Sequence, residues 1–421
     1  MRKSVKIRKI IFEILYEIKQ KNINFDESYS NYTKNIFIND QDKSMIYNIV
    51  LNSIRNNFFI QSVLKKYLEK KTSIKIKILL LSAITQILYL DFKGYAVTND
   101  TVEVAKIKKL NPGLVNALLK NVIINNENIN KKKIEKSSIP NWFTKTLNKN
   151  GLDINKIINN ISKEPSLHLV FKNEKYLKNF NEHYVKTTSS SAFVQKKRKV
   201  TDIENYLKGH WWVQDLASML PIYLSPEFKS KKIIDMCSAP GGKSFQLLSQ
   251  KNDLVLNDIN SKRIDILNNN LNRLNFNGKV TNVNALNISE NKSYDVVVLD
   301  SPCSGVGTLR RNPEILFKKK PPNLNLLIEV QKNLIDKATK LLKNKGTLIY
   351  MVCSFFYEET KDIKHKFLKK NKNFSQQKFE LNKKNEFYQF VDGEGDILCL
   401  PTKFKDHMID GFYAVKFIRN D

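Results

Sequence analysis

The sequence predicts a multidomain protein: an all-α amino-terminal domain, a small α/β subdomain, and an α/β domain with a doubly wound, mostly parallel sheet. Apolar residues recur at helical spacing from residue 1 to about 125, which is typical of packed helices. From Ser230 onward, short apolar runs alternate with helix-forming segments, as in a parallel sheet covered by helices. A chain of 421 residues with 41% hydrophobic residues is long enough for about three domains.

The first part, residues 1–126, is expected to be a helical bundle. Ile7, Ile11 and Ile14 share one helical face, and the run Ile78–Leu90 is apolar nearly all round, as in a buried central helix. The stretch from Asn125 to Lys136 is polar, charged and without periodicity, so we expect a linker there.

The small α/β subdomain is placed at residues 137–228. A helix is expected to begin at Pro140-Asn141-Trp142, and Ser166–Phe171 is typical of a strand. Trp211 and Trp212 could stack on a nucleic-acid base, but packing in the core is the favoured interpretation.

The charge of the chain suits a phosphate-rich partner, although only weakly. The formal net charge is +30 and the pI is about 9.7, which favours binding to RNA through counterion release. The chain is also rich in Lys, Asn and Ile together, as drift in a low-GC genome would produce.

The cysteines and the apolar runs exclude several other classes. No C-x-x-C pair occurs among Cys237, Cys303, Cys353 and Cys399, which argues against a zinc site and leaves no metal expected. The basic amino terminus is interrupted by Glu13 and does not resemble a signal peptide. Since the longest apolar run is too short to span a bilayer, we expect a cytoplasmic protein with no membrane contact.

The α/β domain, residues 229–421, opens with the stretch Ile233–Ser244, IIDMCSAPGGKS. An apolar strand ends in Asp235, a tight glycine turn follows, and a helix begins near Lys243; such turns let backbone N–H groups approach a polar ligand. Cys237 stands where a phosphate-binding P-loop needs its first glycine, and the dinucleotide motif G-x-G-x-x-G is absent. S-adenosylmethionine (SAM) is therefore the favoured ligand, and a turn that binds nothing is the alternative.

A second strand ends at Asp258, 23 residues after Asp235. An acid at that spacing accepts hydrogen bonds from ribose hydroxyls in nucleotide-binding sheets. We therefore expect Asp258 to bind the ribose of the cofactor.

Two later segments each deliver a cysteine from the end of a strand. Asp300–Pro313 is DSPCSGVGTLRRNP, and Gly346–Ser354 is GTLIYMVCS. Together with the APGGK turn, in this order and spacing, the segments resemble the RNA cytosine-5 methyltransferases, and within them the bacterial 16S rRNA methyltransferase B type. The resemblance covers nearly the whole chain and implies a Rossmann-like, SAM-dependent methyltransferase domain preceded by an RNA-recognition-like subdomain.

The amino-terminal part is similar to the NusB-type domain that this family carries. The matching features are Arg55 at the end of LNSIR, the stretch Tyr95–Glu103 and the motif GLVNALLK. The resemblance implies a NusB-like helical domain that aids recognition of RNA, with a simple packing module as the alternative.

The resemblance also assigns a catalytic role to four residues. Carbon 5 of cytosine is too weak a nucleophile to attack a sulfonium methyl group, and addition of a thiolate at carbon 6 activates it. By resemblance, Cys353 is the nucleophile, and Cys303 helps to resolve the adduct. In the usual strand order of such methyltransferases the two strands that carry them are neighbours, so we expect the two sulfurs to converge at one edge of the sheet. Asp300 holds ring nitrogen 3, and Lys243 orients the base. The reverse assignment of the two cysteines, as in DNA cytosine methyltransferases, is the main alternative.

The resemblance further implies the cofactor and RNA contacts. Arg263 matches the family's cofactor-site arginine, Asn284 stands where the family has an Asp for the adenine amino group, and Arg310 and Arg311 are expected to meet RNA phosphates or to shape the site. The full set of expected cofactor-binding residues is Cys237, Ser238, Ala239, Pro240, Gly241, Gly242, Lys243, Asp258, Arg263, Asn284 and Asp300.

The sequence thus predicts a SAM-dependent enzyme, acting as a monomer, that forms 5-methylcytosine in 16S rRNA. A tRNA cytosine-5 methyltransferase is the alternative within the class. A non-catalytic RNA-binding factor in ribosome assembly is the alternative outside it.

Overall fold

The structure is a computed structural model that describes residues 1–34, 38–68, 72–129, 134, 138–195 and 199–421. The chain forms two compact units. Residues 1–151 and 312–322 form the first unit, and residues 152–311 and 323–421 form the second. Half of the predicted linker, residues 130–133 and 135–136, lies outside the described residues. None of the described helices combines the length and apolar character that crossing a membrane requires.

The first unit is helical, as predicted, around one central helix. This helix, α5 (Ile74–Tyr89), is buried along most of its length because apolar residues occupy nearly every face. Ser73 caps its first turn by accepting a hydrogen bond from the backbone N–H of Ile76. The other elements of this unit are α1 (Lys3–Tyr16), η1 (Glu17–Lys21), α2 (Phe25–Thr33), α3 (Asp40–Arg55), α4 (Asn57–Tyr67), α6 (Gly94–Ile107), α7 (Pro112–Ile124), η2 (Asn126–Asn128), α8 (Asn141–Lys149) and α14 (Glu314–Phe317).

A short segment from late in the chain, α14 and its flanks, folds with these helices. Phe317 belongs to their hydrophobic core. Lys19 Nζ donates to the carbonyl oxygen of Phe317 at 2.7 Å, and the backbone N–H of Lys319 donates to the carbonyl oxygen of Lys19 at 3.0 Å. A piece of the predicted methyltransferase domain therefore packs in the amino-terminal unit, which the sequence did not indicate.

The second unit begins with the small sheet that was predicted as a separate subdomain. Its strands have the order β2 (Tyr184–Thr188), β3 (Ser191–Val194), β1 (Leu167–Phe171), β4 (Trp211–Val213), and those that pair are antiparallel. Trp211 and Trp212 are 0% and 3% exposed, and Trp212 donates to the side chain of Gln214, so the packing interpretation is confirmed. The helices before and between these strands are α9 (Ile154–Ile161), α10 (Glu174–Lys178) and η4 (Val200–Asp202).

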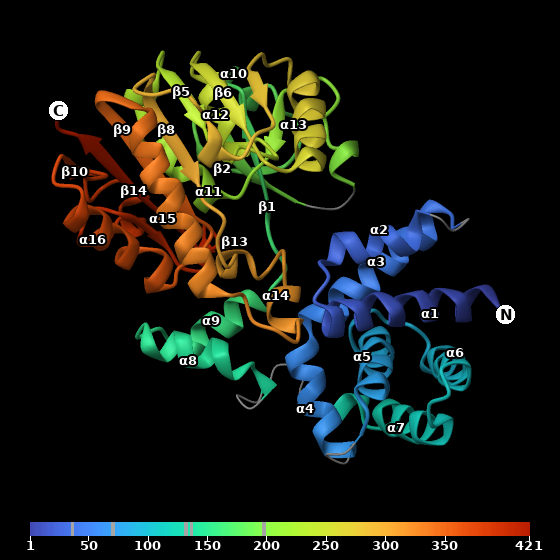
Figure 1. The fold of residues 1–421 in the computed structure, drawn as a ribbon. Helices are drawn as coiled ribbons and strands as arrows, with labels where there is room; N and C mark the ends of the chain where they lie inside the picture. The colour runs from blue at the N-terminus through green and yellow to red at the C-terminus, as the bar shows by residue number, and fades with distance from the viewer. Residues whose placement is uncertain (35–37, 69–71, 130–133, 135–137, 196–198) are drawn as a thin grey trace. The chain divides into compact units, whose positions relative to one another are not determined.

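The main sheet has the strand order β10-β14-β9-β8-β5-β6-β7 (Figure 1). The five strands from β9 to β7 are parallel, and β14 is antiparallel to both of its neighbours, β9 and β10. The bounds are β5 (Lys232–Asp235), β6 (Asp253–Asn257), β7 (Lys279–Thr281), β8 (Tyr294–Asp300), β9 (Leu342–Val352), β10 (Phe374–Gln377) and β14 (Phe412–Arg419). Strand β11 (Ile397–Cys399) also pairs with β14, and β12 (Thr402–Phe404) and β13 (His407–Ile409) form a hairpin.

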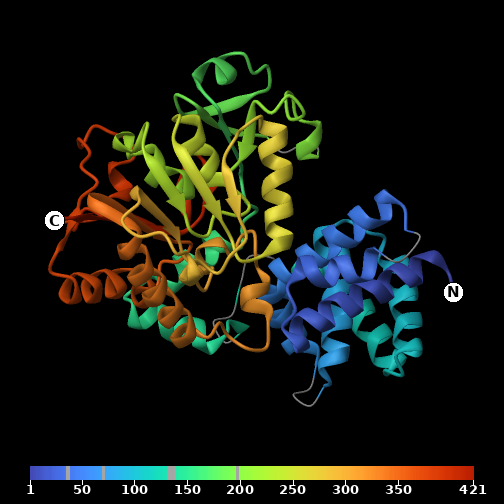
Figure 2. The same ribbon diagram turned by 45° about the horizontal axis from the view of Figure 1, so that its top comes forward.

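Helices cover both faces of this sheet, as a doubly wound fold requires (Figure 2). Alternate residues of one strand face opposite cores, because side chains in a strand point to the two sides in turn: Ile233 packs with α11, α12 and α13, whereas Ile234 packs with α15 and α16. The bounds of the helices are α11 (Leu216–Tyr223), η5 (Pro226–Phe228), α12 (Gly242–Ser249), α13 (Ser261–Leu274), η6 (Ala285–Asn287), η7 (Val306–Thr308), α15 (Leu324–Leu341), η8 (Tyr357–Glu359), α16 (Lys361–Lys370) and η9 (Tyr388–Phe390).

The order of the strands places three carboxyl ends side by side. Strand β8 lies between β5 and β9, with Asp235 in register with Val298 and Asp300 in register with Met351. The segments that follow β5, β8 and β9 therefore meet at one edge of the sheet, where ligands of such folds bind.

Candidate active site

Two thiols meet at this edge of the sheet. Cys303 follows β8 and Cys353 follows β9, and their Sγ atoms are 3.2 Å apart. The expectation that the two sulfurs converge from adjoining strand ends is confirmed. The hydrogen bond with Cys353 is the largest cause, and burial the next, that raises the pKa of the Cys303 thiol well above its usual value. Cys303 therefore carries its proton at neutral pH.

A cavity of about 250 Å³ lies beside Cys353, one of the two cysteines. Most of the predicted site residues line it: Cys237, Ser238, Ala239, Pro240, Gly242, Lys243, Arg263, Asp300, Arg311 and Cys353. The glycine turn and one of the two thiols thus share a single cavity.

The shape of the turn depends on Gly241. Its φ is +113°, a conformation that residues with a Cβ rarely adopt. A Cβ at this position would lie 2.2 Å from the Cζ atom of Phe245. The turn leads directly into α12, so the first backbone N–H groups of that helix lie beside the cavity.

Asp235 was named in the sequence only as the end of a strand, and the structure places it in the wall of the cavity. Ser244 Oγ donates to its Oδ2 atom at 2.7 Å. Its Oδ1 atom is buried and makes no hydrogen bond of standard geometry within the described residues. Burial raises the pKa of Asp235 to about 7. The signal that could have identified Asp235 is its position: it is an acid at the end of the first strand of the main sheet, just before the glycine turn.

Lys243 forms an ion pair with Asp300 in the wall of the cavity. Lys243 Nζ is 2.6 Å from Asp300 Oδ2 and 4.8 Å from the ring centroid of Phe412. All three side chains line the cavity together with Cys353. Phe412, the first residue of β14, was not among the residues predicted for the site. The arrangement offers a carboxylate, an ammonium and an aromatic ring to a planar polar ligand.

The second strand supports the turn from outside the cavity. Asp258 is buried; its Oδ2 atom accepts from the backbone N–H of Ala239 at 3.2 Å and its Oδ1 atom from that of Asn260 at 2.9 Å. Arg263 donates to the carbonyl oxygen of Ala239. Asp258 and the exposed Asn284 do not line the cavity, and the side chain of Asn284 caps η6 by accepting from Leu286.

The two arginines after the Cys303 loop differ in exposure. Arg310 is 1% exposed and pairs with the buried Asp410 at 3.2 Å, so the expectation of an RNA phosphate contact is wrong for this residue, and it shapes the site instead. Arg311 also pairs with Asp410, but its side chain is 39% exposed and lines the cavity.

Comparison with known proteins agrees with this geometry. A family model described as 16S rRNA methyltransferase RsmB/F matches residues 221–418, and a NusB family model matches residues 5–123. Residues 221–418 therefore belong to the RsmB/F methyltransferase family. The chain is a methyltransferase with a NusB-family domain ahead of that region.

Two bacterial relatives align along most of this chain, and a human relative aligns with half of it. Ribosomal RNA small subunit methyltransferase B of Photorhabdus laumondii is 26% identical over 79% of this chain and 83% of that protein. The probable ribosomal RNA small subunit methyltransferase B of Bacillus subtilis is 24% identical over 88% and 90%. The human 28S rRNA (cytosine(4447)-C(5))-methyltransferase is 29% identical over 50% of this chain and 28% of that protein.

Solved structures share the fold of this chain. The crystal structure of PH0851 covers 99% of each chain with a TM-score of 0.70 and 17% identity. The structure of NSun6 from Pyrococcus horikoshii with SFG covers 66% of this chain and 97% of that one, with a TM-score of 0.55 and 16% identity.

Proposed function

We propose that this protein transfers the methyl group of SAM to carbon 5 of a cytosine in 16S rRNA through a covalent adduct between Cys353 and carbon 6. The observation that carries the proposal is the pair of thiols 3.2 Å apart at the edge of a cavity that also contains the ion pair of Lys243 and Asp300. The names of the relatives, which are rRNA small subunit methyltransferases B and 28S rRNA cytosine-C5 methyltransferases, support the substrate class.

The residues around the cavity fit SAM. Asp235 offers a buried carboxylate oxygen without a hydrogen-bond partner of standard geometry among the described residues, which suits the ammonium group of the cofactor. Gly241 leaves room for close approach to the backbone, and the start of α12 presents N–H groups to a carboxylate. SAM supplies an electrophilic methyl group when it is bound.

The side chains of this chain account for the remaining steps. The Cys353 thiolate adds to carbon 6 while the carboxyl group of Asp300 holds nitrogen 3, which makes carbon 5 nucleophilic. After methylation a base removes the proton on carbon 5, the bond between sulfur and carbon 6 breaks, and the Cys353 sulfur leaves as a thiolate. Cys303, whose pKa is raised, can donate a hydrogen bond to that thiolate at 3.2 Å. Cys353 rather than Cys303 lines the cavity, which supports this assignment of roles.

We place the enzyme in the cytoplasm, where it acts as a monomer without a metal ion on 16S rRNA, free or in a small-subunit precursor. The net charge of +30 favours binding to RNA of either kind.

Bisulfite sequencing of rRNA and tRNA from a deletion strain tests the substrate. We expect one cytosine of 16S rRNA to lose its methyl group, and loss at a tRNA position instead would overturn the rRNA assignment. Isothermal titration of the purified protein with SAM tests the class, because a non-catalytic assembly factor would bind no SAM.

A further inference from the structure

One buried carboxylate lies behind both thiols. Each of the two cysteines is followed by a serine, and both serine hydroxyls donate to Oε2 of Glu359, Ser304 at 2.5 Å and Ser354 at 2.6 Å. The other oxygen, Oε1, accepts from the backbone N–H of Ser304 at 2.8 Å and from the side-chain amide of Gln331 at 3.1 Å. One side chain therefore joins the loop after β8 to the loop after β9.

The chemistry of these contacts makes Glu359 a strong link. Glu359 is 0% exposed, and its four partners can all donate, so they match the acceptor capacity of a carboxylate. Four hydrogen bonds, two of them at 2.6 Å or less, fix the position of this carboxyl group. Because Ser304 and Ser354 directly follow the thiols in sequence, fixing the two serines fixes where Cys303 and Cys353 lie.

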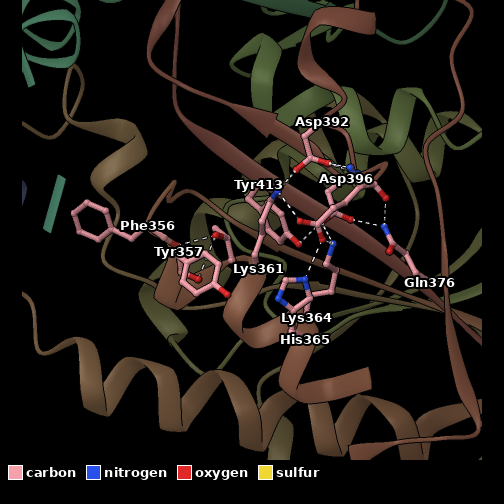
Figure 3. Close-up of polar contacts among 11 residues, drawn as sticks. Phe356, Tyr357, Lys361, Lys364, His365, Gln376, Asp392, Asp396 and Tyr413 are labelled. Atoms are coloured by element: carbon pink, nitrogen blue, oxygen red, sulfur yellow. Dashed lines mark hydrogen bonds and ion pairs between the residues drawn. The ribbon is translucent and has the colours of Figure 1, made fainter. Parts of the chain in front are cut away.

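Glu359 is itself firmly held. Tyr350 Oη donates to its carbonyl oxygen at 2.8 Å. Helix α16, which begins two residues later, is tied to the rest of the unit by buried Lys364, whose Nζ atom is 2.6 Å from Asp396 Oδ2 (Figure 3). Tyr413 of β14 donates to the same Asp396 oxygen at 2.7 Å. The carboxylate therefore has a rigid base from which to set the positions of the two loops.

We infer that Glu359 is a positioning residue that keeps the two thiols close enough for Cys303 to assist the departure of Cys353 from the adduct. The inference rests on the proposed function. A second tie between the loops, from the backbone N–H of Gly307 to the carbonyl oxygen of Cys353 at 3.0 Å, holds the backbone but leaves the thiols to the serine contacts.

The thiol distance can be measured without any RNA. Diamide removes two hydrogen atoms from a pair of nearby thiols to form a disulfide, and mass spectrometry of the digest quantifies the Cys303–Cys353 peptide. We expect Glu359→Ala to slow this cross-link about tenfold or more, because small displacements of reacting groups cost large factors in rate. Glu359→Gln should cross-link within about twofold of wild type, since its amide can accept at Oε1 and donate to both serine hydroxyls.

A second variant covers the case in which Glu359→Ala does not fold. The double variant Ser304→Ala, Ser354→Ala removes the two hydroxyls and should slow cross-linking in the same way. Ser28→Ala is the matched control, because Ser28 is also a buried serine whose hydroxyl donates to a carboxylate, that of Glu17, at 3.0 Å. Ser28 belongs to the first unit, whereas both cysteines belong to the second. The control variant should cross-link at the wild-type rate.

The second readout is resolution of the adduct. With SAM and 16S rRNA, Glu359→Ala should accumulate the protein–RNA adduct on a denaturing gel while its affinity for SAM stays unchanged. Wild-type rates of cross-linking and of adduct release in Glu359→Ala would overturn the inference. A wild-type protein that methylates no RNA would instead overturn the proposed function, and the cross-linking rates would still test the role of Glu359.

Discussion

The glycine turn after β5 and the two thiols after β8 and β9 are built in different ways. The turn is made by consecutive residues, and its shape follows from the φ of +113° at Gly241. The thiols come from positions 50 residues apart and meet at 3.2 Å only because β8 and β9 are parallel neighbours. A cofactor site of the first kind depends on local backbone geometry, whereas a catalytic site of the second kind depends on the order of strands and on buried links such as Glu359.

The largest expected effect is the loss of methylation when either cysteine is replaced, and the two variants should differ in whether the protein–RNA adduct accumulates. Cys353→Ala should lower methylation by about 10³-fold or more and form no protein–RNA adduct, because the nucleophile is gone. Cys303→Ala should also lose turnover but should accumulate the adduct. Incorporation of labelled methyl groups and a denaturing gel measure both quantities. SAM titration of each variant is the control, since the turn is unchanged. Adducts in the opposite pattern would mean that the roles of the two thiols are reversed.

The next effect concerns the turn. Gly241→Ala should destabilise the protein by about 3 kcal/mol, because the added Cβ meets the Phe245 ring and the backbone conformation is strained. The same change should abolish measurable SAM binding. Urea unfolding and calorimetry check both.

Gly393→Ala is the matched control for Gly241→Ala. A Cβ at Gly393 has no neighbour within 4 Å, so we expect unchanged stability and SAM affinity. If both alanine variants bound SAM like wild type, the turn would not be the cofactor site.

The contrast between the two sites also explains what the sequence could predict. The strand ends carrying Asp300, Cys303 and Cys353 were identifiable because apolar runs and short motifs mark them, and the usual strand order then predicts that they meet. The burial of Arg310 and the role of Glu359 depend on partners 100 and 55 residues away, which no local pattern specifies. The docking of residues 312–322 among the amino-terminal helices likewise arises from long-range packing of Phe317.

The contribution of Asp235, the buried acid just before the glycine turn, to the free energy of unfolding should depend on pH to a moderate extent. Burial raises the pKa of Asp235 to about 7, so the folded protein binds a proton there that the unfolded chain releases near pH 4. Its stabilising contribution is complete below that lower pKa and is lost as the pH rises through about 7. The free energy of unfolding of wild type, minus that of Asp235→Asn, should therefore fall by about 3 kcal/mol between pH 5 and 8.

Urea unfolding of both proteins at pH 5, 6.5 and 8 measures this difference. Asp295→Asn serves as the comparison. Partial burial raises the pKa of the Asp295 carboxyl, but hydrogen bonds from the Lys343 side chain and the Lys232 backbone, with the charges of Lys343 and Lys231, lower it overall. Its contribution is lost only in acid and should stay constant over this range. A difference for Asp235 that does not change with pH would show that this carboxyl is ionised throughout, as an exposed acid would be.

The smallest expected effect is that of Asn284→Asp on the affinity for SAM, which tests whether the cofactor site reaches Asn284. Asn284 is exposed, accepts a hydrogen bond from the backbone N–H of Leu286 and does not line the cavity. Asp makes the same capping contact, so Asn284→Asp should change the SAM dissociation constant by less than about threefold. Calorimetric titration of wild type and of Asn284→Asp with SAM measures both dissociation constants. A tenfold gain in affinity would place the adenine amino group at this side chain, and the cofactor site would then extend from the glycine turn across β6 to the end of β7.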